Sequence, residues 1–213
     1  MQCNMAKYHK YVFDIDARRF IGKFDEMYQQ ERTDNFDSWH QEDSRQLNRK
    51  IALDILSCYN FETVIDIGSG KGVLTHQLKK RNNHVLGLDI SPTAIEVARA
   101  RYPDIEFDIA DVNDLPVFTS YLDEKYDASR AGGGVDLVFS AECLSYLENW
   151  RALIRELGTR TRYLLITLFI PEDPIGFVKS AADLEAEVSA HFEILELVMM
   201  KGSRFVILFA KSR

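Results

Sequence analysis

The sequence contains few cysteines, few prolines and no excess of positive charge. Its three cysteines are an odd number without paired spacing, which predicts neither a disulfide framework nor a zinc site. Lysine and arginine number 26 against 33 aspartate and glutamate residues, for a formal net charge of -7. Because a protein that binds a long polyanion needs a basic face, this balance disfavours nucleic acid as a partner.

Long apolar runs, internal repeats and low-complexity linkers are also missing. No window approaches the ~18 apolar residues of a membrane span, and the first residues lack the apolar run of a signal peptide. We therefore expect a cytoplasmic protein with no membrane partner, acting as a monomer or a homodimer. The 46% hydrophobic content of the 213 residues suffices for one large core.

Short apolar segments alternate with helical patterns from residue 45 onward. Strands are expected over 63–67, 84–90, 105–109, 135–140 and 163–169, and helices over 45–59, 73–78, 91–102 and 150–157. This alternation is typical of an α/β doubly wound fold, a parallel sheet with helices on both faces. In the last third, a helix over 181–191 precedes strands over 192–198 and 204–210, whose short connection requires them to be antiparallel. One strand therefore runs against an otherwise parallel sheet.

Two segments fall outside this alternation. Residues 1–44 are expected to form an N-terminal cap or lid, in which Phe20, Phe24 and Tyr28 are spaced as one helical face that serves packing. Residues 45–213 form the main part of what we expect to be a single globular domain. Residues 120–134, with their glycines and charges, are expected to form a mobile surface loop.

A glycine-rich loop follows the first strand of the main domain, with the sequence Gly68-Ser69-Gly70-Lys71-Gly72. Flexible backbone at the carboxyl edge of a doubly wound sheet is typical of a ligand site. A phosphate-binding P-loop requires glycine at position 65 and a hydroxyl at position 72, where isoleucine and glycine stand. A dinucleotide loop requires a third glycine at the position of Val73, so a nicotinamide-dependent oxidoreductase is disfavoured.

Three acids follow successive strands and separate the remaining ligand classes. Asp66, just before the loop, favours a cation over a pyrophosphate. Asp89, at the end of the second strand, is placed to accept hydrogen bonds from both hydroxyls of a ribose. Asp111 is placed to accept from the exocyclic amine of adenine, while the backbone amide of Val112 donates to a ring nitrogen. The alternatives to Asp111 in this role are Asp108 and Asp114.

These segments together resemble the class I S-adenosylmethionine-dependent methyltransferases, over about residues 45–213. The stretches that carry the resemblance are 64–72, 88–92, 110–112 and 136–142. It implies a Rossmann-like sheet of seven strands with the last antiparallel, S-adenosyl-L-methionine as cofactor and S-adenosyl-L-homocysteine as product. It also implies that the glycine loop contacts the methionine moiety, and that Ser140 and Ala141 offer backbone atoms to its ammonium. The expected cofactor-binding residues of the main domain are Asp66, Gly68, Ser69, Gly70, Asp89, Ile90, Asp111, Val112, Ser140 and Ala141.

The N-terminal lid is loosely similar to that of small bacterial methyltransferases, including the nodulation enzymes that methylate an amino sugar. The similarity lies in the runs Phe24-Asp25-Glu26-Met27-Tyr28 and Ser38-Trp39-His40-Gln41-Glu42. It implies that Tyr28 and Trp39 close over the cofactor, and that Arg45 or Arg49 reaches the cofactor carboxylate. His40 is a candidate to take a proton from an incoming hydroxyl or amine, with an ordinary loop histidine as the alternative.

Further candidates for a general base lie after the fourth strand. The Asn-Pro-Pro-Tyr-like motif of methyltransferases that act on amino groups of nucleic acid and on protein glutamine is absent there. Tyr146 stands where similar small-molecule enzymes often carry histidine, but its ordinary pKa of about 10 makes it a poorer base, and the alternative is that it only shapes the pocket. Glu142 is a second candidate, with a surface acid as its alternative. No metal site is expected.

The sequence therefore predicts a methyltransferase that modifies oxygen or nitrogen of a small-molecule acceptor, with a sugar or glycan precursor as one such acceptor. A different class of function stays open, because a catalytically inactive sensor or partner subunit would bind S-adenosylmethionine through the same residues. Only a measurement of turnover separates these two functions.

Overall fold

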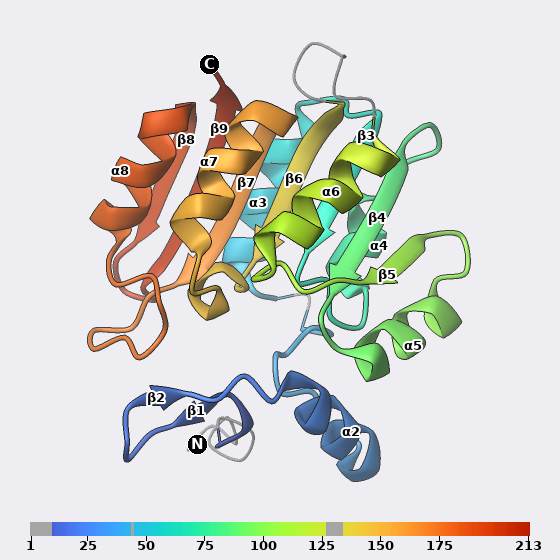
Figure 1. Ribbon diagram of the computed structural model, residues 1–213, viewed down its shortest axis with the longest axis vertical. Coiled ribbons are helices and arrows are strands. Elements are labelled where there is room, and N and C mark those ends of the chain that lie inside the picture. The colour runs from blue at the N-terminus through green and yellow to red at the C-terminus, as the bar shows by residue number, and fades with distance from the viewer. Residues whose placement is uncertain (1–9, 44, 127–133) are drawn as a thin grey trace.

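The computed structural model describes residues 10–43, 45–126 and 134–213. Figure 1 shows one central sheet with helices on both faces, and the N-terminal segment lying beyond one edge of that sheet. No helix within these three ranges is long and apolar enough to cross a membrane.

The sheet has seven strands in the order β5-β4-β3-β6-β7-β9-β8. Their bounds are β3 Thr63–Ile67, β4 His84–Asp89, β5 Glu106–Ile109, β6 Val135–Ala141, β7 Thr161–Phe169, β8 Phe192–Met200 and β9 Phe205–Ser212. The last strand, β9, is antiparallel to both of its neighbours, β7 and β8, while the pairs from β5 to β7 are parallel. The predicted fold, a mostly parallel doubly wound sheet with one antiparallel C-terminal strand, is confirmed.

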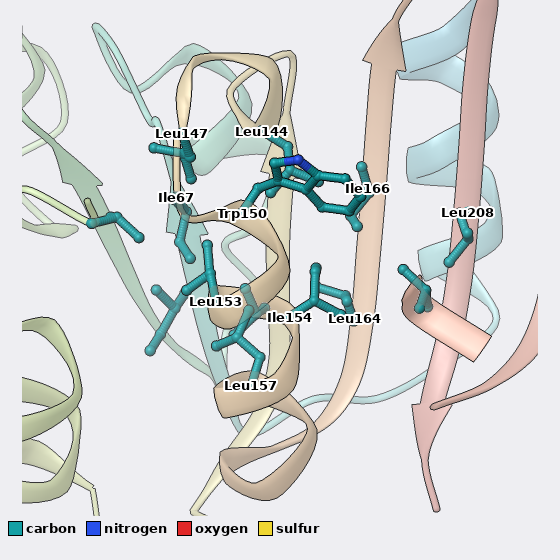
Figure 2. Close-up of a cluster of buried hydrophobic side chains, with 14 of the residues drawn as sticks. Ile67, Leu144, Leu147, Trp150, Leu153, Ile154, Leu157, Leu164, Ile166 and Leu208 are labelled. Carbon is teal, nitrogen blue, oxygen red and sulfur yellow. The ribbon is translucent and has the colours of Figure 1, made fainter. Parts of the chain in front are cut away.

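Two layers of helices bury the faces of the sheet. One layer contains α3 Leu47–Ser57, α4 Val73–Leu78 and α5 Pro92–Arg101, and the other contains α6 Leu115–Lys125, α7 Trp150–Arg160 and α8 Ala181–His191. In Figure 2, Trp150 and Leu153 at the start of α7 lie among Leu144, Ile67 and Ile166. Because helices cover both faces of the sheet, the side chains on both sides of a strand are buried, and the strand sequences are almost continuously apolar.

The start of α5 follows the prediction made from the Ser91-Pro92 pair. The Ser91 hydroxyl accepts a hydrogen bond from the amide of Ala94 at 3.1 Å, and proline occupies the first turn. This cap fixes the direction in which the chain leaves β4, immediately beside Asp89.

Residues 120–125 differ from the loop predicted for 120–134. They belong to α6, which Asp114 caps through the amide of Val117 and whose Phe118 and Leu122 are buried against α7 and the sheet. The helical spacing of these two apolar residues outweighs the nearby charges, because their burial stabilises the helix. Residues 127–133, the glycine-rich part of the predicted loop, lie outside the described residues.

The N-terminal segment consists of a two-stranded hairpin and a helix, which lie at the edge where the parallel strands end (Figure 1). The hairpin pairs β1 Phe13–Asp14 with β2 Arg19–Phe20, and α2 spans Phe24–Asp34. The prediction that Phe20, Phe24 and Tyr28 share a helical face was wrong for Phe20, which lies in β2 opposite Phe13, whereas Phe24 and Tyr28 both lie in α2. Both phenylalanines still pack together, in a separate apolar cluster built around the buried side chains of this segment.

Candidate functional site

A pocket opens at the carboxyl ends of β3 to β6, where the strand order changes direction, and the N-terminal segment covers it. It contains about 990 Å³ of empty space, including its open mouth. Doubly wound sheets bind ligands at this position because the loops that leave the strands diverge there. Among the sequence-predicted site residues, those that line it are Tyr28, Trp39, Arg49, Asp66, Gly68, Ser69, Asp89, Ile90, Asp111, Val112, Ala141, Glu142 and Tyr146.

Asp66 lies on β3 at the floor of this pocket. Its Oδ2 accepts a 2.6 Å hydrogen bond from the Thr75 hydroxyl of α4. Burial raises the pKa of Asp66 to about 7, which outweighs the opposing effect of that hydrogen bond. A cation that enters the pocket next to Asp66 would stabilise its ionised form.

Gly68 forms the tight turn that follows β3. Its φ angle is +78°, and a Cβ atom at this position would lie 2.6 Å from the Cβ of Cys143. The backbone of the glycine loop and the segment after β6 therefore approach each other more closely than a side chain would permit. This contact brings the two walls of the pocket together.

Asp89 ends β4 and holds both neighbouring loops. Its Oδ2 accepts from the Gly70 amide and its Oδ1 from the Ser91 amide, each at 2.9 Å. Burial raises the pKa of Asp89, while these amide hydrogen bonds act in the opposite direction. Each carboxylate oxygen keeps a second lone pair, so Asp89 is able to accept further hydrogen bonds from a ligand.

The third acid of the pocket is Asp111. It lines the pocket beside Val112 and Asn113, and its Oδ1 accepts from the Asn113 amide at 2.9 Å. Of the two alternatives, Asp108 is bonded to Arg99 and Tyr121, and Asp114 caps α6. Only Asp111 among these three is part of the pocket wall.

Glu142 follows β6 in the left-handed conformation, with φ of +59°. Its Oε1 accepts from Asn48 Nδ2 at 3.3 Å and from Thr167 Oγ1 at 3.0 Å, and its Oε2 accepts from the Phe169 amide at 2.6 Å. Removal of the carboxylate from water raises the pKa of Glu142 to about 7, although these hydrogen bonds favour the ionised form. A carboxylate with such a pKa takes up and releases protons near neutral pH.

An aromatic cluster closes the side of the pocket next to Glu142. The Tyr146 ring lies 5.3 Å from the ring of Phe24 and 5.7 Å from that of Trp39, centroid to centroid. The hairpin residues Phe13 and Phe20 pack on the same tyrosine at 5.9 and 6.2 Å. Burial raises the pKa of Tyr146, so its hydroxyl stays neutral at physiological pH.

Ion pairs and hydrogen bonds fasten the N-terminal segment to the glycine loop. The Lys71 ammonium donates to Glu31 Oε2 at 3.1 Å and to Asp37 Oδ1 at 3.0 Å. The Gln41 side chain accepts from the Lys71 amide at 2.9 Å and donates to the Tyr28 hydroxyl at 3.2 Å. This segment is therefore docked directly on the loop that forms the pocket floor.

The two arginines considered for a ligand carboxylate differ in position. Arg49 of α3 lines the pocket, and its guanidinium donates to the carbonyl oxygens of Trp39 and His40 at 3.0 and 2.6 Å. Arg45 is exposed and pairs with Asp43 at 2.9 Å, away from the pocket. His40 contributes its carbonyl to Arg49 but does not line the pocket.

Gly70 and Ser140, two further predicted cofactor residues, also lie behind the pocket wall rather than in it. The amide of Gly70 supports Asp89, and Ser140 is buried within β6. Further residues line the pocket without having been singled out from the sequence: Phe24, Gln41, Ile67, Leu74, Leu88, Ala110, Asn113, Cys143 and Leu147. Most of them adjoin a predicted residue in the sequence, which is the signal that would have found them. No group of three or more potential metal-ligating side chains occurs within the described ranges.

A family model described as a methyltransferase domain matches residues 60–207. A putative methyltransferase, 235L, of Invertebrate iridescent virus 6 is 30% identical over 112 residues, which are 52% of this chain and 37% of the viral protein. The chain thus spans little more than a third of that relative.

Solved structures share the fold at low sequence identity. A putative methyltransferase from Haloferax volcanii, solved in complex with the Trm112 methyltransferase activator, gives a TM-score of 0.68 at 18% identity, covering 89% of this chain and 97% of that one. Magnesium protoporphyrin IX methyltransferase from Synechocystis, solved with bound S-adenosylhomocysteine, gives 0.60 at 19% identity, covering 82% and 84% of the two chains.

Proposed function

This chain belongs to the methyltransferase-domain family, and on that premise we propose that it binds S-adenosylmethionine in the pocket and transfers the methyl group to oxygen or nitrogen of a small metabolite. The observation that carries the proposal is the convergence of Asp66, Asp89 and Asp111, from three successive strand ends, on one pocket. In this assignment Asp66 faces the ammonium of the cofactor, Asp89 accepts from the ribose hydroxyls and Asp111 accepts from the adenine amine.

The chemistry of the pocket wall fits this cofactor. The buried Ser69 hydroxyl has no hydrogen-bond partner within the described part of the chain, although buried polar groups are normally paired. Ser69 lines the pocket, so a polar ligand there would satisfy it. Arg49 is the candidate partner for the cofactor carboxylate, since its guanidinium is the only cationic group among the described lining residues.

When bound, S-adenosylmethionine supplies a methyl group that its sulfonium already activates for direct displacement. The protein therefore needs to align the acceptor and exclude water rather than provide a nucleophile. Tyr28 and Trp39 of the N-terminal segment cover the pocket, and Arg49 holds the backbone of residues 39 and 40 in place. We assign to this segment the role of a lid.

Glu142 is the proposed general base. It lines the pocket beyond the glycine loop, and its pKa of about 7 suits proton uptake from an acceptor at neutral pH. Tyr146 is assigned to the pocket wall, because its raised pKa keeps it protonated. His40 is not assigned a catalytic role, since its ring is not part of the pocket lining.

The acceptor class rests on the lining next to Glu142. The rings of Phe24, Trp39 and Tyr146 form an apolar surface on which a ring compound packs. The C–H faces of a sugar fit such a surface, so sugars and glycan precursors are one acceptor class to screen.

Isothermal titration with S-adenosylmethionine tests cofactor binding. We expect Asp89→Ala to weaken binding at least tenfold, because hydrogen bonds to a charged group contribute roughly 1.5–3 kcal/mol each. Asp104→Ala, which removes an exposed acid of the loop between α5 and β5, serves as the matched control. Absence of binding, or equal binding by both variants, would contradict the cofactor assignment.

Turnover is tested separately, by screening metabolites for the gain of one methyl group from isotope-labelled cofactor. Binding together with a labelled product supports an enzyme. Cofactor binding with no product across a broad screen would instead favour the inactive sensor or partner subunit.

A further inference from the structure

Glu142 is a half-buried acid of the pocket lining, and its hydrogen bonds all come from neutral groups. Its three donors are a side-chain amide, a hydroxyl and a backbone amide, and it forms no ion pair among the described residues. Arg49 acts on it only at longer range, because the guanidinium is engaged by the carbonyls of Trp39 and His40. A cation that reaches such a carboxylate favours its ionised form.

The lining of the pocket as a whole attracts positive charge. It contains four carboxylates, those of Asp66, Asp89, Asp111 and Glu142, against the single guanidinium of Arg49. The proposed function uses the first three acids for the cofactor. Glu142 is left for the acceptor, and each of these acids repels an anionic acceptor such as a phenolate or carboxylate when it is ionised.

The aromatic surface next to Glu142 favours the same charge. Trp39 and Tyr146 line the pocket with their ring centroids 5.7 Å apart, and Phe24 lies 5.3 Å from Tyr146. Aromatic faces attract ammonium groups, tryptophan most strongly, and they also pack against flat apolar compounds. One surface therefore offers both contacts at the side of the pocket closed by the lid.

Resting on the proposed function, we infer that the acceptor is an amine attached to a flat apolar group, with its nitrogen bound at Glu142 and its apolar part packed on Trp39, Tyr146 and Phe24. The acceptor enters as an ammonium and gives one proton to the Glu142 carboxylate. The freed nitrogen lone pair then forms a bond to the methyl carbon while the carbon–sulfur bond breaks and its electron pair stays on sulfur. The products are the methylated ammonium and S-adenosylhomocysteine, with the first proton on Glu142.

Proton affinities separate this acceptor from an alcohol. An alkyl ammonium has a pKa of about 10, as for a lysine side chain. An aliphatic hydroxyl releases its proton at a pKa near that of water, about 15.7. The pKa of Glu142, about 7, is closer to the pKa of an ammonium than to that of an alcohol, so this carboxylate removes a proton far more readily from an ammonium. Glu142 therefore suits a nitrogen acceptor rather than an oxygen acceptor.

Three probes that share an indolylethyl group test the inference: tryptamine, its alcohol analogue tryptophol of nearly the same shape, and the larger, neutral N-acetyltryptamine. Each is titrated at pH 7.5 into the protein saturated with S-adenosylhomocysteine. We expect tryptamine to bind at least tenfold more tightly than either neutral probe. Equal affinities, or no binding by any probe while S-adenosylhomocysteine still binds, would overturn the amine assignment.

Variants locate the source of the preference. Glu142→Gln should reduce the tryptamine-to-tryptophol ratio to about one, and Trp39→Leu should weaken both probes severalfold. Glu148→Gln, an exposed acid six positions further along the chain, should leave the ratio unchanged. Each variant is checked first for binding of S-adenosylhomocysteine, which reports whether it is folded.

The wild-type comparison among the three probes does not depend on any variant, so a variant that does not fold leaves a decisive measurement. A preference that persists in Glu142→Gln would refute the role of this residue. Failure of the wild-type protein to bind S-adenosylhomocysteine would instead refute the proposed function itself.

Discussion

Replacing Lys71 with methionine tests whether the lid is held closed by charge. Lys71 is 16% exposed, and it bridges Glu31, which is 3% exposed, and Asp37, which is 21% exposed. Burial alone would lower the pKa of Lys71, but the two carboxylates outweigh it and raise the pKa, so the ammonium stays charged. Lys71→Met keeps an unbranched side chain that is one atom shorter, and it leaves the Glu31 carboxylate without its cation.

The structure sets the expected size of this effect. Removing one partner of a buried ion pair costs about 3–5 kcal/mol. Water reaches Asp37 and compensates part of the loss, so we take the lower end, about 3 kcal/mol. At 1.36 kcal/mol per factor of ten, the open state of the lid becomes roughly 100-fold more populated. Affinity for S-adenosylmethionine should fall with it.

Amide hydrogen exchange provides the assay, because it reports local opening. The Ser38 amide donates to Glu31 and the amide of position 71 donates to Gln41, so both should exchange up to about 100-fold faster in Lys71→Met. The amide of Leu165, in the middle of β7, should exchange as before. Lys50→Met, which removes an exposed lysine of α3, is the matched control.

A second substitution separates charge from packing. Adding Glu31→Gln to Lys71→Met removes the uncompensated carboxylate, so it should restore part of the protection at Ser38. The reasoning would be refuted if exchange at Ser38 in Lys71→Met stayed within about twofold of the wild type, or if the second substitution caused a further loss instead of a rescue.

Three further substitutions test the floor of the pocket and the hydrophobic core beneath it. Burial raises the pKa of Asp66 from 3.8 to about 7, so ionising this carboxyl in the folded protein costs free energy above pH 4, and the full cost is reached above pH 7. One pKa unit corresponds to 1.36 kcal/mol. The free energy of unfolding of the ligand-free wild type, relative to Asp66→Asn, should therefore fall by up to roughly 4 kcal/mol between pH 4 and pH 7. Urea unfolding at pH 4, 5, 6 and 8 measures this, and a difference independent of pH would contradict it. Gly68→Ala places a Cβ 2.6 Å from that of Cys143 at a φ of +78°, so it should destabilise the fold by at least about 1 kcal/mol and weaken cofactor binding in titration, whereas unchanged binding would show that the turn has room. Trp150→Ala should cost about 3–5 kcal/mol in thermal or urea unfolding, because the side chain is 1% exposed, and a loss below 1 kcal/mol would mean that the core around α7 collapses into the cavity.

The central sheet could be predicted because its strands are buried on both faces and read as unbroken apolar runs. The helix after Ser91 was also predictable, since its cap and its proline are local signals. The β1–β2 hairpin was not, because strands of two residues carry no periodicity. Phe20 was assigned to a helix for this reason.

The site was predictable where a residue follows directly from a strand end, as Asp66, Asp89 and Asp111 do. The lid was harder, since its side chains reach the pocket through tertiary contacts. Spacing left Arg45 and Arg49 as equal candidates, and only the docking of residues 39 and 40 on α3 places Arg49 in the pocket wall. These contacts join residues that sequence patterns do not relate.

Gly70 limits which lid segments from related proteins could replace the lid of this protein. It does not line the pocket, and a Cβ there would lie 2.8 Å from the Tyr28 hydroxyl and closer still to the Gln41 side chain. Gly70 is thus fitted to the lid above it as well as to Asp89 below. A chimaera that carried the lid of a relative would also need the residue that this relative has at position 70. The lid and residue 70 would therefore have to be transferred together.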